Sequence, residues 1–128
     1  MTRLTEQLKL VAPAVRPNVQ AAIKVVKEIA PHADEVACEM APPRSRSMMW
    51  KLVRYKAGDE DVVGIGTFTN HSTLYFYRGV ELDDGSGLLK GSGKDSRFLT
   101  LRAPGDAQRP AVKSLVRRAF KLAKLPKT

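Results

Sequence analysis

Two strand-like segments, Val62–Thr69 and Ser72–Arg78, are separated by only Asn70 and His71. That separation has the length of a tight β-hairpin loop. Asparagine and histidine both tolerate a positive φ better than most residues do, and tight hairpin turns need this tolerance. The middle of the chain is therefore predicted to form an antiparallel hairpin, and this feature constrains the fold more than any other.

Further segments with strand character lie on both sides of the hairpin. Glu35–Met40 is short and mixed, and Met49–Tyr55 is more continuous. In Arg97–Ala103, polar and aromatic residues alternate with leucines, as expected for a strand with one buried face. The intervening stretch Gly79–Ser96 contains five glycines, so it is predicted to be irregular, with its apolar side chains pinning it to the core.

Amphipathic helices are predicted on either side of these strands. Apolar residues recur with a period of 3.6 between Pro17, which suits a first helical turn, and Pro31, which ends the helix near residue 30. The clearest helix begins near Pro110 and ends before Pro126. Its apolar stripe is formed by Val112, Leu115, Val116, Ala119, Phe120 and Ala123.

The order of these elements predicts an α+β fold, an antiparallel sheet of about five strands flanked by an N-terminal and a C-terminal helix. A length of 128 residues is typical of a single domain. Residues 17–124 form the predicted core of this domain. A short helix over residues 3–11, capped by Thr2, and a connector at Pro13–Arg16 are expected to precede it.

Composition and charge narrow the possible surroundings. A single cysteine, Cys38, cannot form an internal disulfide, and no apolar run approaches the roughly 20 residues of a membrane span. We therefore expect a cytoplasmic protein that does not bind membranes. The formal net charge is +9, and residues 109–128 contain seven lysines and arginines but no acidic residue. Such a basic end attracts polyanions in general.

Several segments together resemble the YdhG-like family of bacterial domains of unknown function. The resemblance is carried by Gly66–Gly79 (GTFTNHSTLYFYRG), Gly87–Lys94 (GLLKGSGK), Arg97–Arg102 (RFLTLR) and the helix after Arg109-Pro110, and it covers roughly residues 17–122. It implies a compact antiparallel sheet flanked by helices and no established reaction. It also implies a frataxin-like, iron-handling role as an alternative. Frataxins present an acidic ridge on the first helix, whereas the helix predicted at residues 17–30 has one acid, Glu28.

The sequence contains no recognisable catalytic machinery. Around Gly93-Lys94 the phosphate-binding P-loop pattern fails twice, since Leu88 stands at the first glycine position and Asp95 follows the lysine. His32 and His71 share no ligand spacing, and no residue beside Cys38 indicates an activated thiol. We therefore expect a non-enzymatic binding domain without a cofactor.

Three basic residues are predicted to form an anion site. If strand 97–103 returns antiparallel beside strand 72–78, Arg97 comes back near Arg78, and Lys94 lies just before it. Glycines of the adjacent loop allow backbone N–H groups to face an anion, and arginine suits bidentate anions. A small anionic ligand is therefore the leading expected partner. The structural alternative is that both arginines pair with Glu81, Asp83 or Asp84.

Two other functions remain open. Lys113, Arg117, Lys121 and Lys124 follow one another along the face of the last helix opposite the apolar stripe, and such a face can track the phosphates of a nucleic acid. No aromatic stacking pattern on a strand supports this reading. The acidic groups Asp59-Glu60-Asp61 and Glu81/Asp83/Asp84 would have to supply the ligands of an iron site, but they lack the spacing of an EF-hand loop.

Overall fold

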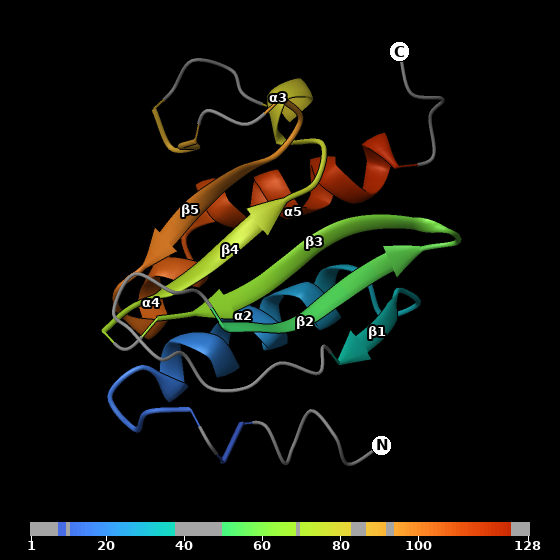
Figure 1. Cartoon of the computed structure of the whole chain (residues 1–128). Helices are drawn as coiled ribbons and strands as arrows, with labels where there is room; N and C mark the ends of the chain where they lie inside the picture. The colour runs from blue at the N-terminus through green and yellow to red at the C-terminus, as the bar shows by residue number, and fades with distance from the viewer. Residues whose placement is uncertain are drawn as a thin grey trace.

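The computed structural model describes residues 8–9, 11–37, 50–68, 70–82, 87–91 and 94–123. Figure 1 shows a five-stranded antiparallel sheet with helices on its N-terminal and C-terminal sides, so the predicted α+β fold is confirmed. The elements are α2 (Arg16–Ile29), β1 (Asp34–Ala37), β2 (Trp50–Ala57), β3 (Glu60–Thr67), β4 (Ser72–Phe76), α3 (Gly79–Leu82), β5 (Arg97–Leu101), α4 (Pro104–Ala107) and α5 (Pro110–Leu122).

The sheet is a simple meander in which every strand pairs antiparallel with the next along the chain, in the order β1-β2-β3-β4-β5. The predicted hairpin is formed by β3 and β4, with Thr67 opposite Ser72 and Val63 opposite Phe76. The ladder ends at Thr67, so the loop is two residues longer than the sequence indicates. Within this loop the Phe68 N–H donates to the His71 carbonyl at 2.8 Å.

One face of the sheet is covered by α2 and α5, which both lie behind it in Figure 1. Apolar residues that recur every 3.6 residues along the helices pack there against apolar residues at every second position of the strands. Each amphipathic helix buries its apolar stripe in this way. Val26 and Val116 from the helices, with Ile65 and Phe76 from the strands, are fully buried in this core. The N-terminal end of α2 is tied to the sheet by Asn18, whose buried side-chain amide donates to the Leu101 carbonyl at 3.2 Å.

Two helices of four residues each were not predicted. In α4 the Asp106 carboxylate accepts hydrogen bonds from the backbone N–H groups of Arg102 at 2.8 Å and Ala103 at 3.2 Å, and this side chain turns the chain after β5. In α3 the turn is closed by Glu81, which is bound to Arg78. Both helices depend on side chains that satisfy nearby polar groups rather than on apolar periodicity.

Some predictions lie on residues outside the described ranges. They concern Thr2 and most of the helix at residues 3–11, Cys38, Asp83, Asp84 and Lys124. Of that first helix, Leu8 and Lys9 are helical, and Val11 just after them is buried against the core. In the part of the chain that is described, no helix has both the length and the apolar composition needed to cross a membrane.

Candidate functional site

A hollow of about 360 Å³ lies on the face of the sheet opposite α2 and α5. It runs over β4 and β5 and reaches β2. Its walls are lined by Lys51, Phe68, Thr73, Tyr75, Tyr77, Ser96, Arg97 and Phe98. Rings therefore supply much of this surface, with one positively charged side chain from β2 and one from the start of β5.

Strand alternation places these rings on the open face. In β4, Leu74 and Phe76 point into the helix-covered core, so Thr73 and Tyr75 between them point the other way. Phe98 is the register partner of Tyr75 and shares its face. Just beyond β4, the ring of Tyr77 meets that of Tyr75 edge to face, with centroids 5.5 Å apart.

The Tyr75 ring lies flat on the sheet because residue 64 is a glycine. Gly64 is the register partner of Tyr75 on β3, and a Cβ atom at that position would lie 2.3 Å from two carbons of the ring. No real Cβ contact is that short. The absent side chain thus lets Tyr75 cover the β3 backbone, which leaves it only 9% exposed. Phe98, at 37%, is the exposed ring of the pair.

A second aromatic contact closes the hairpin end of the hollow. The rings of Phe68 and His71 stack with centroids 4.4 Å apart, and His71 Nδ1 is hydrogen-bonded to the Asn70 side-chain oxygen at 2.7 Å. Partial burial, and then the positive charge of Arg102, lower the pKa of His71 below its ordinary value. The neutral form of the imidazole that stacks on Phe68 is therefore favoured.

The two cations of the hollow stand at different ends of it. Lys51 is exposed and lies in the same cross-strand row as Gly66 and Thr73, whereas Arg97 lies in the row of Phe76. These rows are three residues apart along β4, which is roughly 10 Å at 3.3 Å per residue. The Arg97 guanidinium also donates from Nη1 to the Ser96 carbonyl at 2.7 Å.

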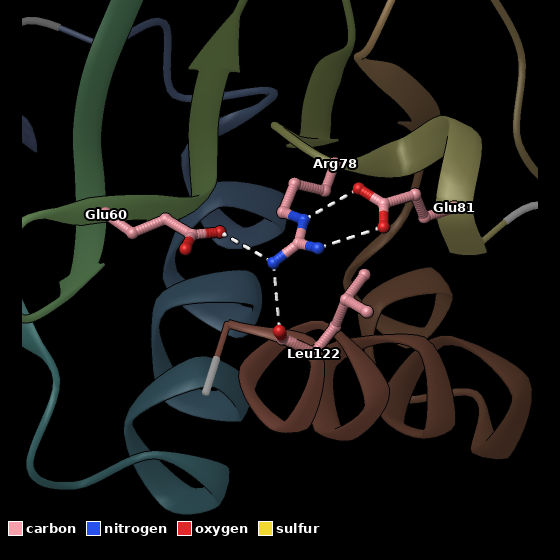
Figure 2. A network of polar contacts seen from close by, with 4 residues as sticks. All are labelled: Glu60, Arg78, Glu81 and Leu122. Atoms are coloured by element: carbon pink, nitrogen blue, oxygen red, sulfur yellow. Dashed lines mark hydrogen bonds and ion pairs between the residues drawn. The ribbon is translucent and has the colours of Figure 1, made fainter. Parts of the chain in front are cut away.

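Arg78, the first residue of the predicted anion site, is held inside the protein (Figure 2). Its side chain is 7% exposed. Nε and Nη2 donate to the two carboxylate oxygens of Glu81 at 2.7 and 2.9 Å, while Nη1 donates to the Leu122 carbonyl at 2.9 Å and lies 3.4 Å from Glu60 Oε2. Hydrogen bonding to Glu81 raises the pKa of Arg78, and the charges of Glu81 and Glu60 act in the same direction against the effect of desolvation.

Arg78 is thus paired with Glu81, as the structural alternative to an anion site predicted for it. The guanidinium pairs with Glu81 in the fork geometry that suits a carboxylate, and it also caps the carbonyl end of α5, where a positive charge is favourable.

The backbone at the predicted site does converge. β5 returns antiparallel beside β4, and a Cβ at Gly79 would lie 2.5 Å from both the backbone nitrogen and the Cβ of Arg97. The Arg78 side chain reaches the end of α5 on the helix side of the sheet, whereas Arg97 is among the residues that line the hollow. Lys94 is exposed in the loop before β5.

The basic residues of the last helix lie on the opposite side of the molecule from the hollow. Lys113 and Arg117 line a groove of about 290 Å³ between α2 and α5, together with Val25, Glu28 and Ile29. Lys121 is exposed on α5, one turn beyond Arg117. The three described members of the predicted basic row, Lys113, Arg117 and Lys121, therefore follow one another along α5. The groove that the first two line also contains the carboxylate of Glu28.

Three of the acidic side chains considered for iron, Glu60, Asp61 and Glu81, are in ion pairs. Glu60 and Glu81 contact Arg78, and Asp61 lies 3.4 Å from Arg54. Within the described ranges, no three side chains of histidine, cysteine, aspartate or glutamate come together as a metal site would require.

Lys51, Tyr75, Tyr77 and Phe98 were missed as site residues by the sequence analysis. The signal for the rings was present, because Thr73, Tyr75 and Tyr77 alternate with Leu74 and Phe76. Two tyrosines on the polar face of a strand indicate a surface with aromatic contacts. No protein-family model matches this chain, and no curated protein or solved structure was found to be similar to it.

Proposed function

We propose that the protein is a non-enzymatic binding domain whose hollow on the open sheet face takes a small anionic ligand with a flat ring. The observation that carries the proposal is the combination of aromatic walls with Lys51 and Arg97 in one hollow. Ligand sites in proteins are typically concave and mostly apolar, with a few polar groups that fix orientation.

The size and chemistry of the hollow support a small ligand. Its volume of about 360 Å³ is near the lower end of the roughly 300–1,000 Å³ typical of small-molecule sites. The exposed edge of Phe98 and the half-buried ring of Tyr77 offer stacking or edge contacts to a planar group. Lys51 and Arg97 supply the attraction for an anionic substituent, and an arginine can bind a carboxylate or phosphate with two donors.

Calorimetric titration with three probes tests this proposal. Naphthoate combines a flat ring with a carboxylate, naphthol keeps the ring without the charge, and inorganic phosphate keeps a charge without the ring. We expect saturable binding of naphthoate, weaker binding of naphthol and no measurable binding of phosphate alone. Equal heats for all three, or none for naphthoate, would contradict the proposal.

Two variants with a matched control locate the binding. Phe98→Ala removes the exposed ring, and Lys51→Ala removes one cation; both are expected to weaken naphthoate binding. The control is Val80→Ala, because Val80 is 41% exposed on α3 and does not line the hollow. The loss expected for Phe98→Ala is about tenfold, in the range of a lost aromatic contact.

The other two functions remain predictions of lower rank. The row Lys113, Arg117 and Lys121 still offers charge to a nucleic acid, but Glu28 shares the groove that two of these residues line. Iron handling depends on the YdhG-like resemblance and on two acidic groups of which Glu60 and Glu81 are paired with Arg78 and Asp61 with Arg54.

A further inference from the structure

We propose that the anionic ligand of the open sheet face is single-stranded nucleic acid, with bases stacked on Phe98 and Tyr77 and phosphates near Lys51 and Arg97. This inference rests on the proposed function, since it names the class of ligand for the same hollow. Three features of the hollow lead to it: the separation of its cations, the exposure of its rings and its place on the sheet face that α2 and α5 do not cover.

The separation of the cations argues against a compact anion as the whole ligand. Lys51 on β2 and Arg97 on β5 are three strands apart across the sheet, which is roughly 14 Å at 4.8 Å per strand, in addition to the roughly 10 Å along the strands. One phosphate or carboxylate can contact only one of them. A single strand carries a negative charge at every nucleotide, so a short stretch reaches both.

The aromatic groups between these cations have the arrangement that unpaired bases use. Phe98 is the exposed ring, Tyr77 is half-buried beside it, and Tyr75 forms the floor over Gly64. Sequence-specific and non-specific proteins alike stack unpaired bases on aromatic side chains that project from a sheet, between basic residues that follow the backbone. Stacking of this kind tolerates any base because every base has a flat face.

Among the described elements, neither α2 nor α5 blocks a chain that continues past the hollow. The described helices α2 and α5 both lie on the far side of the sheet (Figure 1). At the β5 edge the exposed Lys90 is the bridge partner of Phe98, and it lines a separate pocket together with Asp106 and Arg109. Near the opposite, β2 side, Arg54 and Asp61 form an ion pair in which Arg54 Nε lies 3.4 Å from Asp61 Oδ1.

The experiment measures fluorescence anisotropy of end-labelled oligothymidylates from one to about eight nucleotides, a range around the smallest sites of single-strand-binding folds. We expect affinity to rise with length up to about four nucleotides and then to level off. Neutralising two phosphates predicts a log–log salt slope of about −1.4, and Lys51→Ala should reduce it by about 0.7. The control variant Lys24→Ala, exposed on α2, should leave both values unchanged.

Stacking is tested with two variants at one position. Phe98→Ala should weaken binding of the longer oligonucleotides about tenfold. Phe98→Leu keeps an apolar side chain but not the ring, so it should weaken binding to a similar extent while keeping the fold. Val80→Ala is again the control, and circular dichroism verifies that each variant is folded.

The possible outcomes separate this inference from the proposed function. If naphthoate binds but affinity for oligothymidylate shows no length dependence, the nucleic-acid inference is wrong and the small-ligand proposal stands. If neither probe binds, both are wrong. If duplex and single strand bind equally and only the double variant Lys113→Ala with Arg117→Ala loses binding, nucleic acid binds the helix side and the inference is overturned.

Discussion

At the scale of single residues, Arg78 decides how the end of the sheet is built. Its guanidinium joins Glu81 of α3, Glu60 at the start of β3 and the last carbonyl of α5. These partners are 3, 18 and 44 residues away in the sequence. Glu81 could be anticipated from spacing, but Glu60 and Leu122 reach Arg78 only because β3 pairs with β4 and α5 packs beneath them.

Replacing Arg78 should therefore reduce stability rather than remove a binding site. Arg78→Ala leaves two carboxylates and the Leu122 carbonyl without their donor, and such groups are costly when they are poorly solvated. Arg78→Lys keeps the charge but not the fork of donors, so it should fall between wild type and Arg78→Ala. Thermal melting should give that order. A melting temperature unchanged in Arg78→Ala, or lost naphthoate binding in folded Arg78→Lys, would contradict this role.

Tyr55 gives a prediction for alkaline pH. Its hydroxyl donates to Glu35 Oε2 at 2.7 Å, and burial, followed by this hydrogen bond and the charge of Glu35, raises the pKa of Tyr55 well above its ordinary value. The neutral side chain is thus favoured in the folded state. Its contribution to stability is complete below the unfolded pKa of about 10 and decreases above it, where the unfolded chain ionises.

Denaturation of Tyr55→Phe over a pH series measures this contribution. At pH 7 the variant should be less stable by about 1 kcal/mol, the usual net value of one hydrogen bond. Above about pH 10 the difference from wild type should shrink, because phenylalanine has no proton to lose in the unfolded state. A difference that stays constant to higher pH would show that Tyr55 ionises equally in both states.

At the scale of elements, the sequence was sufficient wherever a local pattern controls the structure. The hairpin of β3 and β4, and helices α2 and α5 between their prolines, follow from periodicity and from residues that end or begin a helix. The return of β5 beside β4 also follows from the meander. Helices α3 and α4 do not, because four residues carry no period.

The candidate site was predictable only in part for a related reason. Arg97 was identified as a site residue, and it does line the hollow. Arg78 was grouped with Arg97 by position in the chain, but its side chain is bound to Glu81 and to the last carbonyl of α5, and sequence spacing does not show the contact with α5. Lys51 joins the hollow only through the β2–β3 register, which sequence spacing does not determine.

The packing of the Tyr75 ring on β3 depends on Gly64, and this cross-strand contact can be tested. Gly64→Ala would bring a Cβ atom to 2.3 Å from the Tyr75 ring, and an overpacked position of this kind costs about 1–3 kcal/mol. Removing the ring first with Tyr75→Ala should make the same substitution cheaper. The control is Gly105→Ala, since a Cβ there meets no atom within 4 Å.

A double-mutant cycle of urea denaturation gives the coupling between the two positions. We expect a coupling free energy of about 0.5–3 kcal/mol, as for residues in direct contact. If Gly64→Ala costs the same in both backgrounds, Tyr75 does not lie over Gly64 and the floor of the hollow is built differently.

At the scale of the whole molecule, the two sides of the sheet have different roles. The helix side contains the core and, on the outer surface of α2 and α5, the groove that Lys113 and Arg117 line. The open side contains the aromatic hollow with Lys51 and Arg97. Since the net charge of +9 favours anions at either surface, attraction alone does not tell which side binds.

The most direct test of the open-face site is therefore a map of binding by amide chemical shifts in a nitrogen-15 spectrum titrated with naphthoate. The largest saturable changes should fall on Thr73, Tyr75 and Phe98 and on their neighbours in β4 and β5, with α5 unaffected. Saturable changes centred on Lys113 and Arg117, with β4 and β5 unchanged, would contradict the assignment of the ligand site to the open face.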